Sequence, residues 1–399
     1  MSAATRMPPL PPPLEGQRFE TVPTAGGQAG VVHDPAQGAY AATLRVGGRQ
    51  FALVDPAEQE VLLSLWGDAL AAFCREGSPV AEVRWSEWVA PAGMEEQHAY
   101  LREHATAEPA GAAQASYREV LGSVAPVATR HEVLVTVVVS ARRGRSSARR
   151  REREGVTPAV AVLLEEVRQL RRRLEAAGLF VWGPLDVREL WRAVRVRLDP
   201  SIMSALEGTG CSLAERAGLS SVTDRGPLRA RTEWSQVSVD GAVHRSWWFR
   251  DWPRTDVGPA WMANLLLFCG CVRTVSVCLQ PVPLRVSQRA ILRQAAKLES
   301  DVSQRQRSGF RVGAYHRRAA QAVEEREEEL VSGFSELEYV GLVTATASSV
   351  SELDTAGADL VEVAAGCHVE LQPLQGRHAD GLAAALPLAR GLAHRLVTA

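Results

Sequence analysis

The most distinctive part of the sequence is WWFRDWPRTDVG at residues 247–258, which an apolar run separates from VRTVSV at residues 272–277. The first block closes a segment from position 243 that predicts a strand, with alternate side chains facing the core. The apolar run predicts a short helix at 259–268, and the second block predicts another strand at 272–280. A strand, a helix and a strand in this order indicate an α+β unit.

The residues after this unit predict a long helical hairpin, then a strand, a helix and a last strand. The hairpin spans 284–331 and breaks around Ser308-Gly309, and its first arm would reach roughly 34 Å at 1.5 Å per residue. Apolar residues step along both arms by three or four positions, as a helical seam requires. They are Ile291, Ala295, Leu298 and Val302, then Ala319, Val323 and Leu330. A strand at 336–347, a helix opened by the capping box SVSE at 349–352, and a strand at 367–371 complete this half.

The first half of the chain predicts the same order of elements. A hairpin turns at residues 34–38, strands follow at 39–46 and 51–54, and a helix starts at Asp55-Pro56. Further strands are predicted at 80–89, 132–140 and 179–182, and further helices at 94–104, 115–121 and 158–178. The repeat lies in the order of the elements and not in residue identity.

These patterns predict an α+β protein made of two tandem ferredoxin-like lobes, which are split β-α-β units with helical inserts. The long hairpin is the insert of the second lobe. The predicted domains are a Pro-rich disordered leader (1–27), a first lobe (28–183), a helical and irregular connector (184–235) and a second lobe (236–399). A length of 399 residues fits two domains better than one.

Composition places the chain among soluble globular proteins. Its net charge of −1 excludes a whole-molecule field that would draw nucleic acid or membrane. Of the 45 basic residues only Lys297 is lysine, a bias that fits a GC-rich actinobacterial genome. Residues 1–27 lack the apolar core of a secretory signal, and no apolar stretch reaches the roughly 20 residues that span a bilayer. We therefore expect a cytoplasmic protein with reduced thiols.

The sequence lacks the usual motifs of catalytic and metal sites. A P-loop ATPase needs the pattern Gly-x-x-x-x-Gly-Lys-Ser/Thr, and the one lysine stands inside a predicted helix. No His-Glu-x-x-His pair, no Gly-x-Ser-x-Gly elbow and no regular cysteine spacing is present. The sequence therefore predicts no enzyme, no catalytic residue, no cofactor and no metal site, although a triad assembled from distant residues would leave no motif.

One predicted loop carries seven arginines within twelve residues. Either it binds nucleic-acid phosphates or anionic lipid headgroups, or it is a solvated insertion. No aromatic residues interleave for base stacking, which favours the insertion. The candidate residues for anion contact are Arg142, Arg143, Arg145, Arg149, Arg150, Arg151 and Arg153.

Tryptophans 247, 248, 252 and 261 cluster within fifteen residues. Such a cluster either stacks on a ligand or packs in the core, and the inward alternation of the strand favours the core. A protruding hairpin is also a common docking element. The candidate residues for partner docking are Trp247, Trp252, Arg254, Asp256, Arg305, Arg307 and Phe310.

The blocks at 247–258 and 272–277, with LLL at 265–267 between them, resemble actinobacterial EccE-type proteins, accessory subunits of type VII secretion membrane complexes. The wider layout resembles the N-terminal, non-motor region of the CagE/TrbE/VirB conjugation ATPases. The matching pieces are FALVDP at 51–56, RHEV at 130–133 and LPLARGL at 386–392. Such relatives carry a membrane anchor or continue into a P-loop motor, and we expect neither in this chain.

The resemblance implies a non-enzymatic scaffolding subunit of a type VII or type IV-like secretion or conjugation apparatus. Its expected partners are membrane subunits of that apparatus and a separate P-loop ATPase, which it would meet at the cytoplasmic face of the membrane. Two other hypotheses stay open. One is a nucleic-acid-binding accessory of DNA transfer that acts through the loop at 142–153, and the other is an enzyme with a cleft between the lobes.

Overall fold

The fold is organised around one antiparallel sheet to which both halves of the chain contribute. The structure, a computed structural model, describes residues 10, 14–48, 51–92, 95–104, 111–125, 128–140, 157–203, 229–268, 270–307 and 313–390. In the first half the elements are β1 (Arg18–Thr24), β2 (Gly27–Asp34), β3 (Ala39–Gly47), η1 (Phe51–Leu53), α1 (Pro56–Ala71), η2 (Ala72–Cys74), β4 (Val80–Pro91), α2 (Glu95–His104), α3 (Ala112–Val124), β5 (Thr129–Ser140), α5 (Pro158–Ala176), β6 (Phe180–Pro184) and α6 (Val187–Leu198). In the second half they are β7 (Ala230–Thr232), β8 (Val237–Val239), β9 (Ala242–Asp251), α9 (Ala263–Leu267), β10 (Val272–Pro281), α10 (Leu284–Arg307), α11 (Ala314–Val331), β11 (Leu337–Ala347), α12 (Val350–Gly366), β12 (Glu370–Pro373) and α13 (His378–Ala385).

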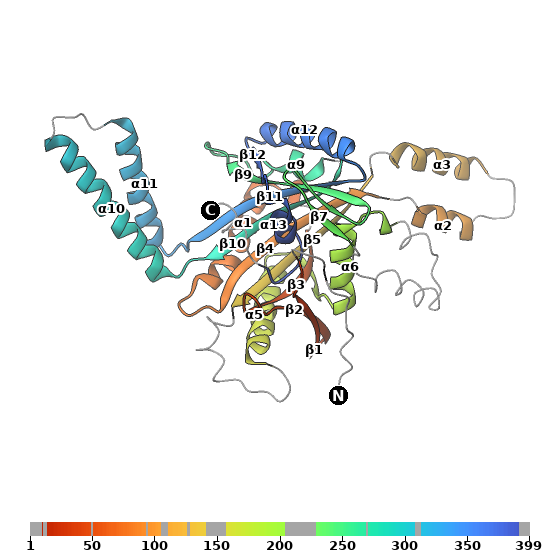
Figure 1. Ribbon diagram of the computed structural model, residues 1–399, viewed down its shortest axis with the longest axis horizontal. Helices are drawn as coiled ribbons and strands as arrows, with labels where there is room; N and C mark the ends of the chain where they lie inside the picture. The colour runs from red at the N-terminus through yellow and green to blue at the C-terminus, as the bar shows by residue number, and fades with distance from the viewer. Residues whose placement is uncertain are drawn as a thin grey trace.

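The twelve described strands pair in the order β1-β2-β3-β5-β4-β10-β11-β9-β8-β7. β6 lies on the outer edge of β3 beside β2, and β12 lies on the outer edge of β9 beside β8. Helices and strands are mixed along the chain around this single sheet (Figure 1). The predicted α+β class is confirmed.

The two halves repeat one another element by element. Each begins with a two-stranded hairpin and continues as strand, helix, strand, two inserted helices, strand, helix, strand and helix. The strand order is also the same, β6-β3-β5-β4 in the first half and β12-β9-β11-β10 in the second. In each half the inserted helices connect two strands of the sheet. Helices α2 and α3 lie between β4 and β5 in the chain, and α10 and α11 lie between β10 and β11.

The repeat extends to individual residues. The sequence Leu-Val-Thr occurs at 134–136 in β5 and at 342–344 in β11. Thr136 shares a hydrogen bond of 3.0 Å with the hydroxyl of Thr43 on β3, and Thr344 shares one of 2.8 Å with the hydroxyl of Ser246 on β9. The expectation that the repeat lies only in the order of elements is therefore wrong at these positions.

The halves meet where β4 pairs with β10. Arg84 of β4 lies opposite Thr136, and Thr274 of β10 lies opposite Thr344, so these two positions correspond in the repeat. Two residues further on, Ser86 and Ser276 also correspond, and they lie directly opposite each other. An approximate two-fold axis therefore passes through this pair, and the pairing covers a strand edge that each half would otherwise expose.

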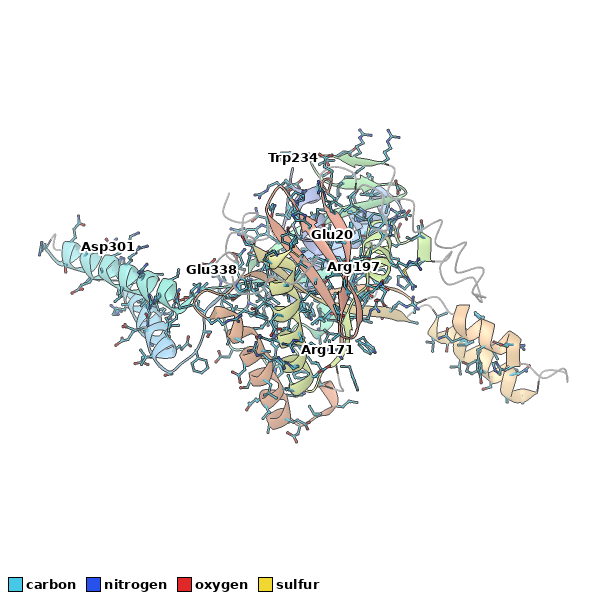
Figure 2. The ribbon with its side chains drawn as sticks, turned by 90° about the horizontal axis from the view of Figure 1, so that it is seen from below. Glu20, Arg171, Arg197, Trp234, Asp301 and Glu338 are labelled. Carbon is cyan, nitrogen blue, oxygen red and sulfur yellow. The ribbon has the colours of Figure 1, made fainter. Side chains whose placement is uncertain are left out.

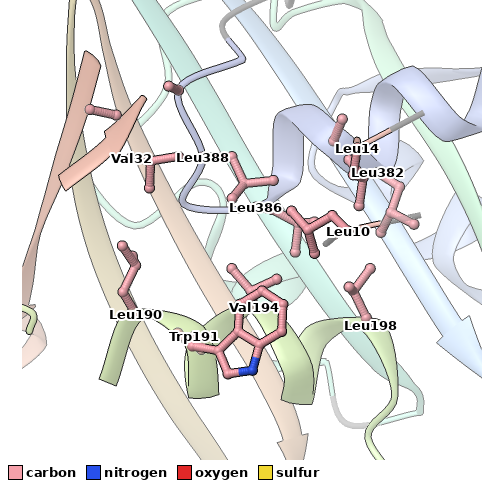
Figure 3. Close-up of a cluster of buried hydrophobic side chains, with 14 of the residues drawn as sticks. Leu10, Leu14, Val32, Leu190, Trp191, Val194, Leu198, Leu382, Leu386 and Leu388 are labelled. Carbon is pink, nitrogen blue, oxygen red and sulfur yellow. The ribbon is translucent and has the colours of Figure 1, made fainter. Parts of the chain in front are cut away.

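Helices cover both faces of the sheet. One face carries α1 and α5 over the first half and α9 and α12 over the second, in two apolar clusters that share Trp85. The other face carries α6 and α13. Figure 3 shows Leu190, Val194 and Leu198 of α6 facing Leu386, beyond the end of α13. Because this cluster draws on both halves, it buries apolar surface across the pseudo-symmetry axis.

Two ion pairs cross between the halves. Arg195 of α6 contacts Asp240 in the β8–β9 turn at 3.4 Å, and Arg390, beyond α13, contacts Asp34 at the β2–β3 turn at 3.1 Å. Each half thus fastens its final helical segment to the hairpin of the other half. The lobe boundaries predicted at 183/184 and 235/236 stay a prediction, since α6 packs against both halves.

The two inserted hairpins project from opposite sides of the sheet (Figures 1 and 2). In the α10–α11 hairpin Ile291 and Val323 are buried in the seam, and Ala295, Leu298, Ala319 and Leu330 are half-buried. The predicted hairpin and its seam are confirmed. No described helix is both long and apolar enough to cross a membrane.

Three predicted elements were wrong in part. Residues 51–53 form the 3-10 turn η1 instead of a strand, and the Gln59 side chain donates to the carbonyl of Phe51 at 2.9 Å. The leader is not disordered throughout, because β1 pairs with β2 and its Phe19 ring packs edge-on against Trp191 at 5.2 Å. The helix predicted at 259–268 is only Ala263–Leu267.

Candidate functional site

Arg273 of the second distinctive block contacts the apolar run that precedes it. Its buried guanidinium donates hydrogen bonds to the carbonyls of Leu265 (3.1 Å), Leu266 and Phe268. Carbonyls at the end of a helix have no partner within it, so Arg273 satisfies those that close α9. This contact fixes the C-terminal end of α9, and with it the segment between the blocks, against β10.

An aromatic cluster forms where β9 ends. The Trp252 ring lies 5.0 Å from Phe249, 5.0 Å from Tyr339 and 6.1 Å from Trp261, between ring centroids. Gly341 of β11 makes this packing possible, because a Cβ there would stand 2.5 Å from the Phe249 ring. The segment after β9 is therefore held on the sheet by aromatic edge contacts.

Trp247 belongs to the core instead of a docking surface. It is 4% exposed, and its ring stands 3.1 Å from the position that a Cβ on Gly357 of α12 would take. Its candidate role in partner docking is corrected accordingly. The side chain points inward because β9 alternates, which is the reason that favoured a core position in the sequence.

Trp252 and Arg254 line an open hollow of about 490 Å³ between the end of β9, β12 and the last turns of α12. Its lining also includes Val361, Ala365, Glu370 and Leu371. Val361 and Ala365 are one helical turn apart on α12 and exposed, so they form one apolar wall. An apolar hollow with a charged rim is suited to receive a side chain of a partner.

The rim of this hollow carries paired charges. Arg254 contacts Asp251 at 2.8 Å, and Arg250 contacts Glu370 at 3.1 Å. The hydrogen bond from Arg254 lowers the pKa of the Asp251 carboxyl below its usual value. Asp251 therefore stays ionised, and the exposed Arg254 side chain, which is 82% accessible, keeps both its charge and its freedom to exchange partners.

The remaining candidates from the sequence lie elsewhere. Asp256 is exposed in the segment after the hollow, and Arg305 and Arg307 are exposed at the far end of α10. Figure 2 shows Asp301 of the same helix on the projecting arm, away from the sheet. Phe310 and the arginine loop at 142–153, with all seven of its candidates, fall outside the described residues.

Several exposed apolar side chains of the first half were not predicted. On α1 and the neighbouring first-half elements the exposed aliphatic and aromatic residues include Leu53, Val61, Phe180 and Trp182. The Trp182 ring lies over Gly47, where a Cβ would stand 2.6 Å from it. Helix α1 buries Ala69 and Leu70 and half-buries Leu62 and Trp66, so the exposed Val61 lies outside its buried face.

Several buried titratable groups are held neutral. Burial raises the pKa of the Cys278 thiol to about 12 and that of Cys271 to about 11. Burial also lowers the pKa of His244 and of His378 to about 4. Among the described residues no three His, Cys, Asp or Glu side chains are grouped to hold a metal ion.

Comparison with models of known protein families gave no match, and comparison with curated proteins gave none either.

Proposed function

We propose that this chain is a scaffolding subunit of an actinobacterial type VII or type IV-like secretion or conjugation apparatus. It docks at the cytoplasmic face of the membrane complex or on its separate P-loop ATPase. The hollow beside Trp252 is the principal contact, and it is the observation that carries the proposal. Four of its ten lining residues, Asp251, Trp252, Arg254 and Thr255, stand in the block 247–258 on which the resemblance to EccE-type proteins rests, and the other six come from residues 361–371.

The architecture supports a scaffolding role. A continuous sheet with helices on both faces is a rigid support, and two helical hairpins project from it in opposite directions (Figure 1). We also propose that each half is a ferredoxin-like lobe. The order fourth-first-third-second of β6-β3-β5-β4 and of β12-β9-β11-β10 supports this assignment, as does the antiparallel pairing of neighbours.

The test places larger, charged side chains in the hollow and leaves the buried residues of the core unchanged. Val361 and Ala365 are exposed on α12, so replacing both with glutamate (Val361→Glu, Ala365→Glu) leaves the packing of that helix intact. Val350→Glu at the start of the same helix, also exposed, is the matched control. Each tagged chain is purified from its own host after the membranes are solubilised, and the partners are identified by mass spectrometry.

The proposal expects a P-loop ATPase and membrane subunits to co-purify with the unaltered chain and with the control, and to be lost with the filled hollow. Recovery of the unaltered chain alone would reject it. Hydrolysis of ATP by the pure chain would reject the non-enzymatic role. Co-purification of DNA that depends on the arginines at 142–153 would favour the nucleic-acid hypothesis in its place.

A further inference from the structure

Helix α10 carries a row of cations on the side that faces away from α11. Arg285, Arg289, Arg293 and Lys297 follow one another at intervals of four residues, and all four are exposed. The row is about 18 Å long at 1.5 Å per residue. The seam residue Ile291 lies two positions from Arg289 and from Arg293, which is about 200° around the helix, so it faces the opposite side.

Carboxylates stand only near the ends of this row: Glu76 accepts the backbone N–H of Arg285 at 3.0 Å, and Asp301 follows Lys297 by four residues. The sequence between Leu284 and Leu298 contains no acidic residue. Arg289, Arg293 and Lys297 form no ion pair with the part of the chain that the structure describes. The charges of Arg289, Arg293 and Lys297 are therefore available to a partner.

The row lowers the stability of its own helix. Like charges four residues apart repel one another, and Arg285 stands in the first turn, where the helix dipole disfavours a cation. The genomic preference for arginine over lysine explains which cation is used, but it does not explain the spacing. Because folding gains nothing from the row, its presence indicates an anionic partner.

Two aliphatic side chains accompany the cations. Leu292 is 62% exposed and Val286 is 52% exposed, and both lie with the row in one sector of about 140° around the helix, opposite the seam. Cations beside exposed aliphatic tips are typical of a helix that lies on a bilayer, with guanidinium groups on headgroup phosphates and tips at the acyl boundary. A nucleic acid offers the same phosphates but calls for polar or aromatic contacts to bases, and no aromatic residue stands between Leu284 and Leu298.

We propose that the outward face of α10 is a binding site for an anionic lipid surface. Arg289, Arg293 and Lys297 contact headgroup phosphates, and Leu292 enters between them. The site does not depend on the proposed protein partners, because it requires lipid alone.

The experiment measures binding of the full chain to two kinds of lipid vesicle by flotation. One is phosphatidylcholine alone, and the other is phosphatidylcholine with phosphatidylglycerol at three to one. The variant Arg289→Glu, Arg293→Glu, Lys297→Glu is compared with a control of equal charge change on other exposed helix positions, Arg118→Glu, Arg172→Glu, Arg188→Glu. A labelled DNA duplex is titrated in parallel, and circular dichroism verifies that each variant is folded.

We expect binding to the anionic vesicles only. Since each cation near such a surface strengthens binding about five-fold, the α10 variant should bind roughly 100-fold more weakly and the control only a few-fold more weakly. Leu292→Ser should weaken binding without changing its salt dependence. Three outcomes would each overturn the proposal. They are equal losses of vesicle binding in both charge variants, no binding of the unaltered chain to anionic vesicles, and α10-dependent binding to the DNA duplex alone.

Discussion

His244 and His378 are buried on the face of the sheet that α6 and α13 cover. His244 donates from Nε2 to the Leu198 carbonyl at 3.0 Å, so its Nδ1 accepts from the Thr346 hydroxyl at 2.9 Å. His378 accepts the backbone N–H of Ser246 through Nδ1 at 3.1 Å. Both rings are therefore neutral. In that form His244 joins the two halves through Leu198, and His378 ties α13 to β9 within the second half.

The stability of the chain should consequently fall in mild acid. The pKa of His244 is about 4 in the folded chain and 6.5 in the unfolded chain. As the pH falls, the unfolded state therefore takes up the proton first. The contribution of this residue is complete above pH 6.5 and is lost toward pH 4, on the order of 3 kcal/mol. Denaturant unfolding across this range should show a shallower pH slope for His244→Gln, and an unchanged slope would contradict the account.

Arg84 is a second residue on which the fold depends. It is fully buried, and it donates to the Leu386 carbonyl at 2.7 Å, to the Arg390 carbonyl at 3.2 Å and to the buried carboxylate of Glu82. Arg84→Met leaves that carboxylate without its cation and should cost about 3–5 kcal/mol. Adding Glu82→Leu should recover part of the loss in urea unfolding. A double variant no more stable than the single one would show that the ion pair is not the cause.

Among the elements, the α10–α11 arm should melt independently of the sheet. Its buried Val323 belongs to none of the apolar clusters of the core. Val323→Asp places a charge in the seam and should raise hydrogen exchange across 284–307 and 314–331, with little change in the main thermal transition. Ala320→Asp, which is exposed on the same helix, is the control. A fall in the main transition for Val323→Asp would mean that arm and sheet unfold together.

The sequence predicted most individual elements, because their signals are local. Asp55 and Ser349 cap α1 and α12 as their spacing indicated, with side chains that accept from Glu58 and Glu352. The pairing of β4 with β10 left no such signal, since a strand that is buried between neighbours shows the same alternation whichever partner it has. The hollow beside Trp252 also left no signal in the sequence. It depends on Gly341, far away in the chain, where the missing side chain lets Phe249 and Trp252 pack on the sheet.

On the scale of the whole molecule, the halves should not fold separately. Residues 1–203 and 229–399 each expose one strand of the β4–β10 pair, and the Leu190–Leu386 cluster needs both. Each fragment alone should aggregate or self-associate through the bare edge, whereas co-expressed fragments should form a one-to-one complex in light-scattering chromatography. Trp88→Pro within β4 should abolish that complex. Two stable monomers would instead indicate independent domains.

We propose that the hollow beside Trp252 holds a subunit of a membrane secretion apparatus. A photo-crosslinking amino acid at Ala365 in the full chain, expressed in its own host, tests this most directly, with the same group at exposed Val350 as the control. We expect crosslinks to a membrane subunit or to its P-loop ATPase from position 365 and not from position 350. No crosslinks from 365, or the same crosslinks from both positions, would contradict it.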